Sequence, residues 1–211
     1  MQQLCFMENK DHAAVKAHLA KDEVLAAILE TVEPYPLVHH KNICLRLCAS
    51  IMSQQLSTKV AAVIYKRFLE LYGGNEPTPR QILDTPFDAL RAIGLSGNKV
   101  NYVHNVARHM IENQVDDEQI DRMSDEQVTE FFTAIKGVGR WTTEMLLMFT
   151  LGREDVFAPD DLGIQQSMIK LYGLDSTNKK ELRKRMEEIA SKWSPYRTWA
   201  CFYLWKHKDA K

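Results

Sequence analysis

A short turn with two glycines has the residue types of an anion-binding site. It comprises Lys136, Gly137, Val138 and Gly139, and it separates the end of one predicted helix from an apolar run at residues 140–150. Such a turn is commonly no more than a tight connection, because glycine reaches positive φ without steric cost. Where a turn opens a helix, however, its successive N–H groups form a concavity that binds a phosphate or another anion.

Two adjacent carboxylates follow the apolar run. Asp160 and Asp161 come directly after Pro159 and begin another apolar segment. Both acids have a structural interpretation as the first residues of a helix, where the helix dipole stabilises negative charge. Carboxylates are also groups that stabilise developing positive charge and transfer protons in active sites. The order of glycine turn, helix, Pro-Asp-Asp and helix is far more specific than either feature alone.

This order of motifs resembles the helix-hairpin-helix plus Gly/Pro-Asp signature of the DNA glycosylase superfamily. In that family a hairpin grips the DNA backbone, and a downstream aspartate serves the cleavage of a base from its sugar. The resemblance implies that residues 136–139 are the hairpin and that Asp161 is the catalytic carboxylate. Asp161 would stabilise an oxocarbenium-like sugar and orient or deprotonate water. We expect Asp160 to cap the local helix or the helix after the hairpin.

The end of the chain narrows the resemblance. Residues 193–200 read W-S-P-Y-R-T-W-A, and residues 203–205 read Y-L-W. This ending resembles the C-terminus of the 3-methyladenine DNA glycosylase II type, and the matching blocks run from about Pro34 to Trp205. The resemblance implies an enzyme of base excision repair that removes alkylated bases, such as 3-methyladenine and 7-methylguanine, from double-stranded DNA.

Aromatic and methionine side chains in the matched segments are candidates for the base pocket. Trp141 and Trp205 match aromatic positions of the family's alkylbase pocket, and Met145 and Phe149 lie on the same helical face as Trp141. Alkylated purines carry positive charge, so they would stack on electron-rich indoles through cation–π attraction worth about 0.5 to 2 kcal/mol. For Met145 and Phe149, packing in the core is the alternative.

The residue type at position 141 also predicts the product. Family members that cut the DNA backbone carry a lysine here, directly after the hairpin, and this lysine attacks the sugar to form a Schiff base. The indole of Trp141 cannot form one. The resemblance therefore implies a monofunctional enzyme, which releases the base with water and leaves an intact abasic site.

The junction after the predicted helix at residues 43–53 is a second candidate contact with DNA. In the resembling family this junction inserts a side chain into the space left by an extruded nucleotide. A solvated turn between two helices is the alternative. The candidates for insertion are Gln54, Gln55, Leu56 and Ser57.

Cysteine and histidine positions do not indicate a transition metal or an iron–sulfur cluster. Cys5, Cys44, Cys48 and Cys201 lack zinc-site or cluster spacing. Cys44 and Cys48 lie on one apolar helix face, and we expect both to be core thiols. No cofactor is required, and the resemblance implies only a structural monovalent cation, Na⁺ or K⁺, at the hairpin. Its ligands would be the backbone carbonyls of Thr133, Ile135 and Gly137.

The spacing of apolar residues predicts helices throughout the chain and no convincing strand. Asp22, Ser57 and Ser124 are expected to cap helices, and residues 78–81 form a capping box that Thr85-Pro86 repeats. The joint at residues 94–99 looks like a second, weaker hairpin, with a plain turn between helices as the alternative.

We expect an all-α, two-lobed helix-hairpin-helix glycosylase fold without an iron–sulfur cluster, in a single unit that spans residues 1–211. A central lobe at about residues 36–150 would contain the hairpin. Residues 1–35 and 151–211 would form the second lobe, with the site between the two.

Length and composition suit this architecture. The 211 residues, 45% of them hydrophobic, can bury a core. No stretch approaches the roughly 18 to 20 apolar residues of a membrane span, and the start of the chain lacks a basic segment followed by an apolar one. We therefore expect no membrane partner, and a location in the cytoplasm at the bacterial nucleoid or, in a eukaryote, in the nucleus.

The charges give no overall signal for nucleic-acid binding, since the formal net charge is −1 and the isoelectric point is near 6.7. They are clustered, however, with an acidic stretch at residues 112–130 and a basic stretch at residues 170–208. Charge runs are commonly solvated faces, but a protein with one DNA-facing side would also show such clusters.

We predict a monomeric, monofunctional glycosylase that flips alkylated bases out of double-stranded DNA and hydrolyses their bond to the sugar. One alternative is an enzyme of the same fold that acts on hypoxanthine or uracil. Another, from a different class, is a noncatalytic hairpin protein that binds DNA and would not need Asp161. The presence of Trp141, Asp161 and Trp205 together favours catalysis.

Overall fold

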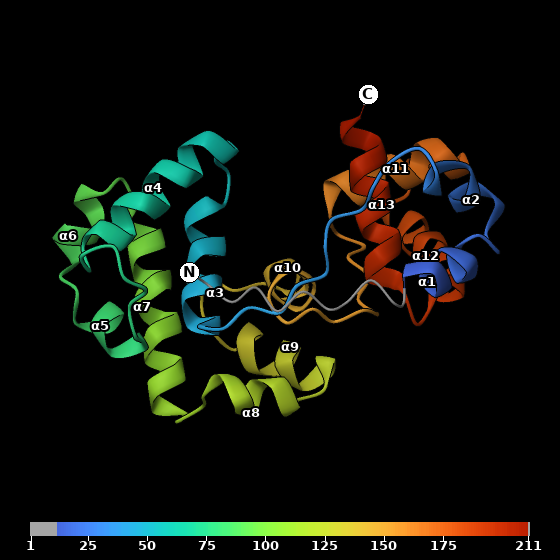
Figure 1. Ribbon diagram of the computed structural model, residues 1–211. Coiled ribbons are helices and arrows are strands. Elements are labelled where there is room, and N and C mark those ends of the chain that lie inside the picture. Colours follow the sequence, from blue (N-terminus) through green and yellow to red (C-terminus); the bar gives the residue numbers. More distant parts are fainter. Residues whose placement is uncertain (1–11, 211) are drawn as a thin grey trace. The chain divides into compact units, whose positions relative to one another are not determined.

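The computed structural model describes residues 12–210. Every secondary-structure element in that range is a helix (Figure 1). This confirms the all-α prediction. The chain divides into two compact units. The central unit runs from His40 to Leu146, and the terminal unit comprises the chain up to His39 and from Leu147 onward. Cys5 lies outside the described residues.

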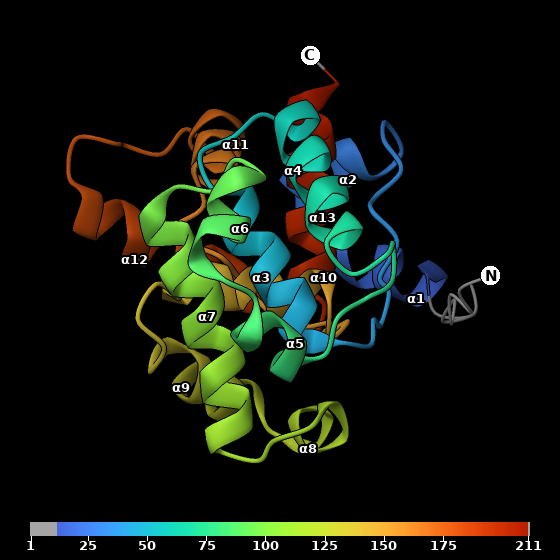
Figure 2. The ribbon, with the colours of Figure 1, turned by 90° about the vertical axis from the view of Figure 1, so that its left-hand side faces the viewer.

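The central unit is built around α7, which packs against α3 and α5, while α3 also packs against α4 (Figure 2). Its helices are α3 (Ile43–Ser53), α4 (Thr58–Glu70), α5 (Pro79–Asp84), α6 (Phe87–Ala92), α7 (Gly97–Glu112), α8 (Asp117–Arg122), α9 (Asp125–Thr133) and most of α10 (Arg140–Phe149). The apolar face of α7 is buried, as are Cys44 and Cys48. Cys48 Sγ lies 3.9 Å from the Val103 carbonyl oxygen, so these cysteines are core thiols.

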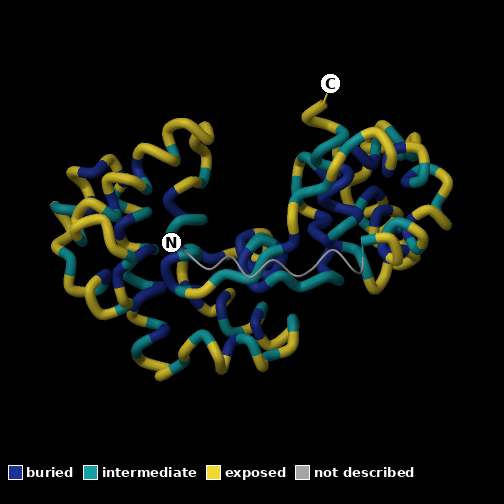
Figure 3. Tube along the Cα trace, in the orientation of Figure 1, coloured by how far each residue is buried: buried dark blue, intermediate teal, exposed yellow. Residues whose placement is uncertain are grey.

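The terminal unit contains the helices from both ends of the described chain. They are α1 (His12–Leu19), α2 (Glu23–Leu29), α11 (Leu162–Tyr172), α12 (Lys179–Ala190), the 3₁₀ turn η1 (Ser191–Trp193) and α13 (Arg197–Asp209). α13 packs against α11 and α2, and the aromatic rings of Trp193 and Tyr203 are fully buried. Figure 3 shows that each unit has its own buried interior.

Asp22 joins three segments of the terminal unit. Its Oδ1 accepts hydrogen bonds from the N–H groups of Val24 and Leu25, and it caps α2 as predicted. Its Oδ2 accepts hydrogen bonds of 2.9 Å from the Tyr172 hydroxyl and 2.9 Å from the Trp193 indole N–H. Burial, and then the Asp22 charge, raises the pKa of the Tyr172 phenol. This donor therefore stays protonated at neutral pH.

Most of the predicted helix starts are confirmed by side-chain hydrogen bonds. Ser57 caps α4, Ser124 caps α9, and residues 78–81 form the predicted capping box at α5. The prediction that Thr85-Pro86 repeats this device is wrong, since α6 has no side-chain cap. The Thr85 hydroxyl instead donates to a carbonyl in the preceding helix, a local bond that competes with capping.

Part of each charged stretch has a structural role. In the basic stretch, Arg183 pairs with Asp160 at 2.7 Å and Arg185 pairs with Glu188 at 2.5 Å. In the acidic stretch, the Asp117 carboxylate accepts hydrogen bonds from two backbone N–H groups at the start of α3. These engagements weaken the case that either stretch faces DNA as a whole.

Candidate active site and DNA-binding hairpin

The predicted hairpin lies between α9 and α10, and the protein itself fixes its shape. Gly137 has a φ of 108°, in the left-handed region that favours glycine. A Cβ atom at Gly137 would also lie 2.2 Å from the ring of Tyr102 on α7. The next residue, Val138, is buried and donates its N–H to the Ile135 carbonyl at 3.0 Å. The fold therefore requires glycine at position 137.

Neither backbone conformation nor packing requires glycine at position 139. It is exposed, its φ lies outside the positive range, and a Cβ atom there would meet no atom of the described structure within 4 Å. Gly139 directly precedes α10, and the first N–H groups of a helix have no partner within the helix. The missing side chain lets an anion approach them closely, and Lys136 adds an exposed positive charge.

The two glycines predict two distinguishable outcomes. Gly137→Ala introduces backbone strain and a clash with Tyr102, so we expect a lower melting temperature. Gly139→Ala should fold normally but weaken binding to damaged and undamaged duplexes alike, because phosphate contacts do not read sequence. Thermal unfolding and equilibrium binding at matched salt concentrations measure these effects. A loss of binding limited to damaged DNA would contradict a phosphate-binding role for the hairpin.

Asp161 is the N-cap of α11, and two donors hold its side chain. Its Oδ1 accepts a hydrogen bond of 2.9 Å from the Ile164 N–H and one of 2.8 Å from the Trp205 indole N–H. The first bond caps α11, and the second ties the cap to α13. Because two donors converge on one oxygen, the carboxylate is held in one orientation while the residue stays partly exposed.

The expectation that Asp160 caps the local helix is wrong. The helix begins at Leu162, so the capping position falls on Asp161, one residue later than expected. Asp160 is exposed, and its two carboxylate oxygens accept hydrogen bonds of 2.7 and 2.8 Å from Arg183 on α12. The two adjacent acids thus have separate tasks.

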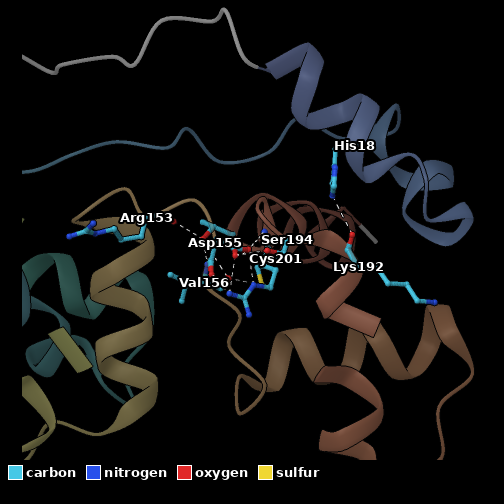
Figure 4. A network of polar contacts seen from close by, with 9 residues as sticks. His18, Arg153, Asp155, Val156, Lys192, Ser194 and Cys201 are labelled. Atoms are coloured by element: carbon cyan, nitrogen blue, oxygen red, sulfur yellow. Dashed lines mark hydrogen bonds and ion pairs between the residues drawn. The ribbon is translucent and has the colours of Figure 1, made fainter. Parts of the chain in front are cut away.

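The segment between α10 and α11 is anchored by residues at the start of α13 (Figure 4). Arg197 donates to both oxygens of Asp155, at 2.7 and 3.0 Å, and the Ser194 hydroxyl donates at 2.7 Å. Burial alone would raise the pKa of Asp155, but the hydrogen bonds from Arg197 and Ser194 outweigh it and hold that pKa below its ordinary value. The Thr198 hydroxyl oxygen accepts a hydrogen bond of 3.0 Å from Val156 N–H. The C-terminal motif therefore fixes the segment that leads into α11.

Trp205 belongs to an aromatic cluster of the terminal unit. Its ring centroid lies 5.6 Å from that of Phe149 and 6.1 Å from that of Phe202. Phe149 also contacts the ring of Tyr35, with centroids 6.0 Å apart. Phe149 and Trp205 are both half-buried. Phe149 thus packs in a cluster and supports the pocket candidate Trp205, so both of its interpretations remain open.

Trp141 and Met145 lie one helical turn apart on α10, in the central unit. Trp141 is 38% exposed, whereas the residues at 142–144 are buried. Met145 is half-buried. An indole this exposed is not a fully buried core residue. The assignment of Trp141 and Met145 to a base pocket stays a prediction.

The loop between α3 and α4 carries the candidates for insertion into DNA. Gln54 is half-buried and its side-chain amide donates to the Thr142 hydroxyl at 3.3 Å, and Ser57 caps α4. Gln55 has a φ of 59°, which is unusual for a residue other than glycine, and Leu56 is 37% exposed. Because Gln54 and Ser57 have structural tasks, this arrangement favours Gln55 or Leu56 for insertion.

Lys99 holds this loop, a role that the sequence did not reveal. Its Nζ donates to the carbonyl oxygens of Met52 at 2.9 Å and Gln54 at 2.6 Å. These carbonyls end α3, where a cation is favoured. Burial lowers the pKa of the Lys99 ammonium. Lys99 belongs to the joint at 94–99, where Ser96 caps α7, so this joint both starts a helix and supports the loop.

A bound ion could be held by side chains or by backbone carbonyls. Within residues 12–210, no three histidine, cysteine or acidic side chains are arranged to hold a metal ion. The expected monovalent cation would instead bind backbone carbonyls at the hairpin. One of them, at Ile135, accepts the Val138 N–H and keeps a second lone pair for a cation. In the same range, no helix is long and apolar enough to cross a membrane.

The hairpin and the Pro-Asp-Asp segment lie within a region that matches a known protein family. Residues 48–192 match the model of the HhH-GPD superfamily of base excision DNA repair proteins. The chain belongs to this family. The HhH-GPD match includes the loop at 54–57, the hairpin, α10 and Asp161, while Trp205 lies beyond its end.

Individual relatives indicate which type of HhH-GPD protein this chain resembles. DNA-3-methyladenine glycosylase 1 of Schizosaccharomyces pombe is 37% identical over 84% of this chain and 74% of its own length. A DNA-3-methyladenine glycosidase structure from Bacillus halodurans is 36% identical, with a TM-score of 0.79 over 94% of this chain and 90% of the other. An S. pombe 3-methyladenine DNA glycosylase in complex with abasic DNA is 33% identical, with a TM-score of 0.82 over 93% and 97%. Both resemblances found in the sequence are confirmed.

Proposed function

We propose that this HhH-GPD protein is a monofunctional DNA glycosylase that flips alkylated bases out of double-stranded DNA and excises them by hydrolysis. The observation that carries the proposal is the 2.8 Å hydrogen bond from the Trp205 indole to Asp161. It places a candidate wall of the base pocket directly against the candidate catalytic carboxylate. The similarity to 3-methyladenine glycosylases, one of them solved with abasic DNA, supports the same activity.

Each part of the site has one task in this proposal. The hairpin at residues 136–139 binds the DNA backbone through N–H groups, and a side chain from the loop at 54–57 fills the gap left by the flipped nucleotide. The cationic base stacks on an indole ring, for which Trp141 and Trp205 are the candidates. Asp161 stabilises the positive charge that develops on the sugar as the bond breaks, and orients or deprotonates the attacking water.

The chemistry of the substrate reduces the demands on the pocket. An alkylated purine such as 3-methyladenine or 7-methylguanine carries positive charge, so it leaves the sugar readily. A pocket that stacks the base without many specific hydrogen bonds would therefore select substrates partly by the weakness of their bonds. Trp141 offers no amine for a Schiff base, so the abasic strand stays intact.

The setting of the reaction follows from this substrate. We propose that the protein acts as a monomer on DNA, at the nucleoid in a bacterium or in the nucleus in a eukaryote. A monovalent cation bound by the carbonyls of Thr133, Ile135 and Gly137 would hold the hairpin in its DNA-binding shape.

A panel of duplexes that carry alkylated purines, hypoxanthine or uracil tests the proposal. We expect release of free alkylated purine, and slower or no release of the other two bases. Preferential release of hypoxanthine or uracil would instead support a glycosylase of the same fold for another lesion. Binding to every duplex with no base released would support a noncatalytic hairpin protein.

A further inference from the structure

Gly163 is a glycine that neither backbone conformation nor helix stability explains. It is the second residue of α11 and follows the cap, Asp161, and the first helical residue, Leu162. Its φ lies outside the positive range. Alanine is a better helix former than glycine. The absence of a side chain at position 163 must therefore serve something other than the helix itself.

The indole of Trp205 occupies the space that a side chain would need. A Cβ atom built at Gly163 would lie 2.9 Å from Trp205 Cδ1 and 3.0 Å from Trp205 Nε1. It would also lie 3.0 Å from Asp161 Oδ1. The indole is not free to retreat without loss, since the edge that meets Gly163 is the edge that donates to Asp161.

We propose that Gly163 is a positioning residue for excision, because only glycine allows the Trp205 indole to lie against the start of α11 and donate to Asp161. The pocket wall and the carboxylate then form one rigid unit, and a side chain at position 163 separates them. This inference rests on the proposed function, in which Asp161 stabilises the sugar and Trp205 stacks on the base. It adds Gly163, which touches neither reacting atom, as the residue that makes their contact possible.

The Gly163→Ala variant tests this inference. We expect its single-turnover excision rate on alkylated DNA to fall about 10- to 100-fold, the range that a small misplacement of catalytic groups produces. Its affinity for a duplex with an abasic-site analogue should stay close to that of the wild type, since the hairpin is untouched. A glycine with only a structural role predicts a lower melting temperature and an unchanged excision rate in the folded protein.

A double-mutant cycle with Trp205→Phe identifies the route of the effect. Phenylalanine keeps an aromatic ring but has no N–H to donate, and its smaller ring relieves the contact with a new Cβ atom. We expect Trp205→Phe alone to lower the rate, and Gly163→Ala to cause no further loss in that background. This arm also serves if the single Gly163→Ala variant folds poorly, because the double variant lacks the clash.

Two outcomes would overturn the inference. One is a Gly163→Ala rate within about twofold of the wild type, in a protein with normal DNA affinity. The other is a loss of the same size in the wild-type and Trp205→Phe backgrounds, which would show that the effect does not pass through the indole. If the wild type released no alkylated base at all, the proposed function itself would fail.

Discussion

Replacement of Asp161 by asparagine is expected to lower excision of alkylated purines by more than about 100-fold, a loss typical of removing a group that stabilises transition-state charge. The two side chains have nearly the same shape, so the change removes negative charge and little else. The asparagine oxygen can still accept the Ile164 N–H that Asp161 accepts at 2.9 Å, and asparagine is a favourable cap. The fold of α11 should therefore survive, together with binding to lesion-containing DNA.

Single-turnover excision and equilibrium binding to the same duplex measure the two halves of this expectation. The matched control is Asp160→Asn, the same chemical change one residue earlier. Asp160 is exposed and pairs with Arg183, so its replacement should cost little stability, in line with other exposed ion pairs, and leave excision near the wild-type rate. An Asp161→Asn enzyme that excises within about threefold of the wild type would refute the catalytic role.

Replacement of Trp141 by alanine is expected to lower excision by a smaller factor than Asp161→Asn. This indole is 38% exposed, so its loss leaves no large cavity in the core. The stacking that it provides acts only on a flipped base, and cation–π attraction contributes about 0.5 to 2 kcal/mol. We therefore expect excision of cationic 3-methyladenine or 7-methylguanine to fall by about 2- to 30-fold, as that energy range implies.

The control is the affinity of Trp141→Ala for undamaged duplex, which should change little. Trp141→Phe keeps an aromatic ring and should retain more activity than Trp141→Ala. If both variants lost undamaged-DNA binding and excision in equal proportion, Trp141 would be a contact for the DNA backbone instead of a pocket wall.

The features that could be predicted from the sequence are those whose causes are local. A cap such as Asp22 or Ser57 acts within three residues of itself, and an apolar helix face repeats every turn, so both are visible in a short window. The hairpin and the C-terminal motif were recognisable because several residues occur in a fixed order.

The features that could not be predicted depend on contacts between distant segments or on the exact register. Asp160 and Asp161 both fit the start of a helix, and only the position of Leu162 decides which of them caps it. No local pattern gives a reason for Gly163, because Trp205, the residue that fills the space beside it, lies on α13. The pairing of Asp161 with Trp205 spans 44 residues of sequence, which no local pattern encodes.

Lys99 illustrates a second limit. Its partners are backbone carbonyls at the end of α3, and carbonyls are present at every position of any sequence. The sequence therefore contains no particular residue type that would identify the helix end to which such a lysine binds. The same reasoning applies to Tyr102, whose side chain occupies the space that a Cβ atom on Gly137 would need.

The most direct test of hydrolytic excision is to incubate the wild-type protein with a duplex that carries one alkylated purine, in the presence and absence of borohydride. Hydrolysis by water, with Trp141 in place of an amine nucleophile, predicts release of the free base and no covalent protein–DNA adduct. Strand breaks should then appear only after alkali opens the abasic site. A borohydride-trapped adduct, or a strand cut without alkali, would contradict hydrolysis by a monofunctional enzyme.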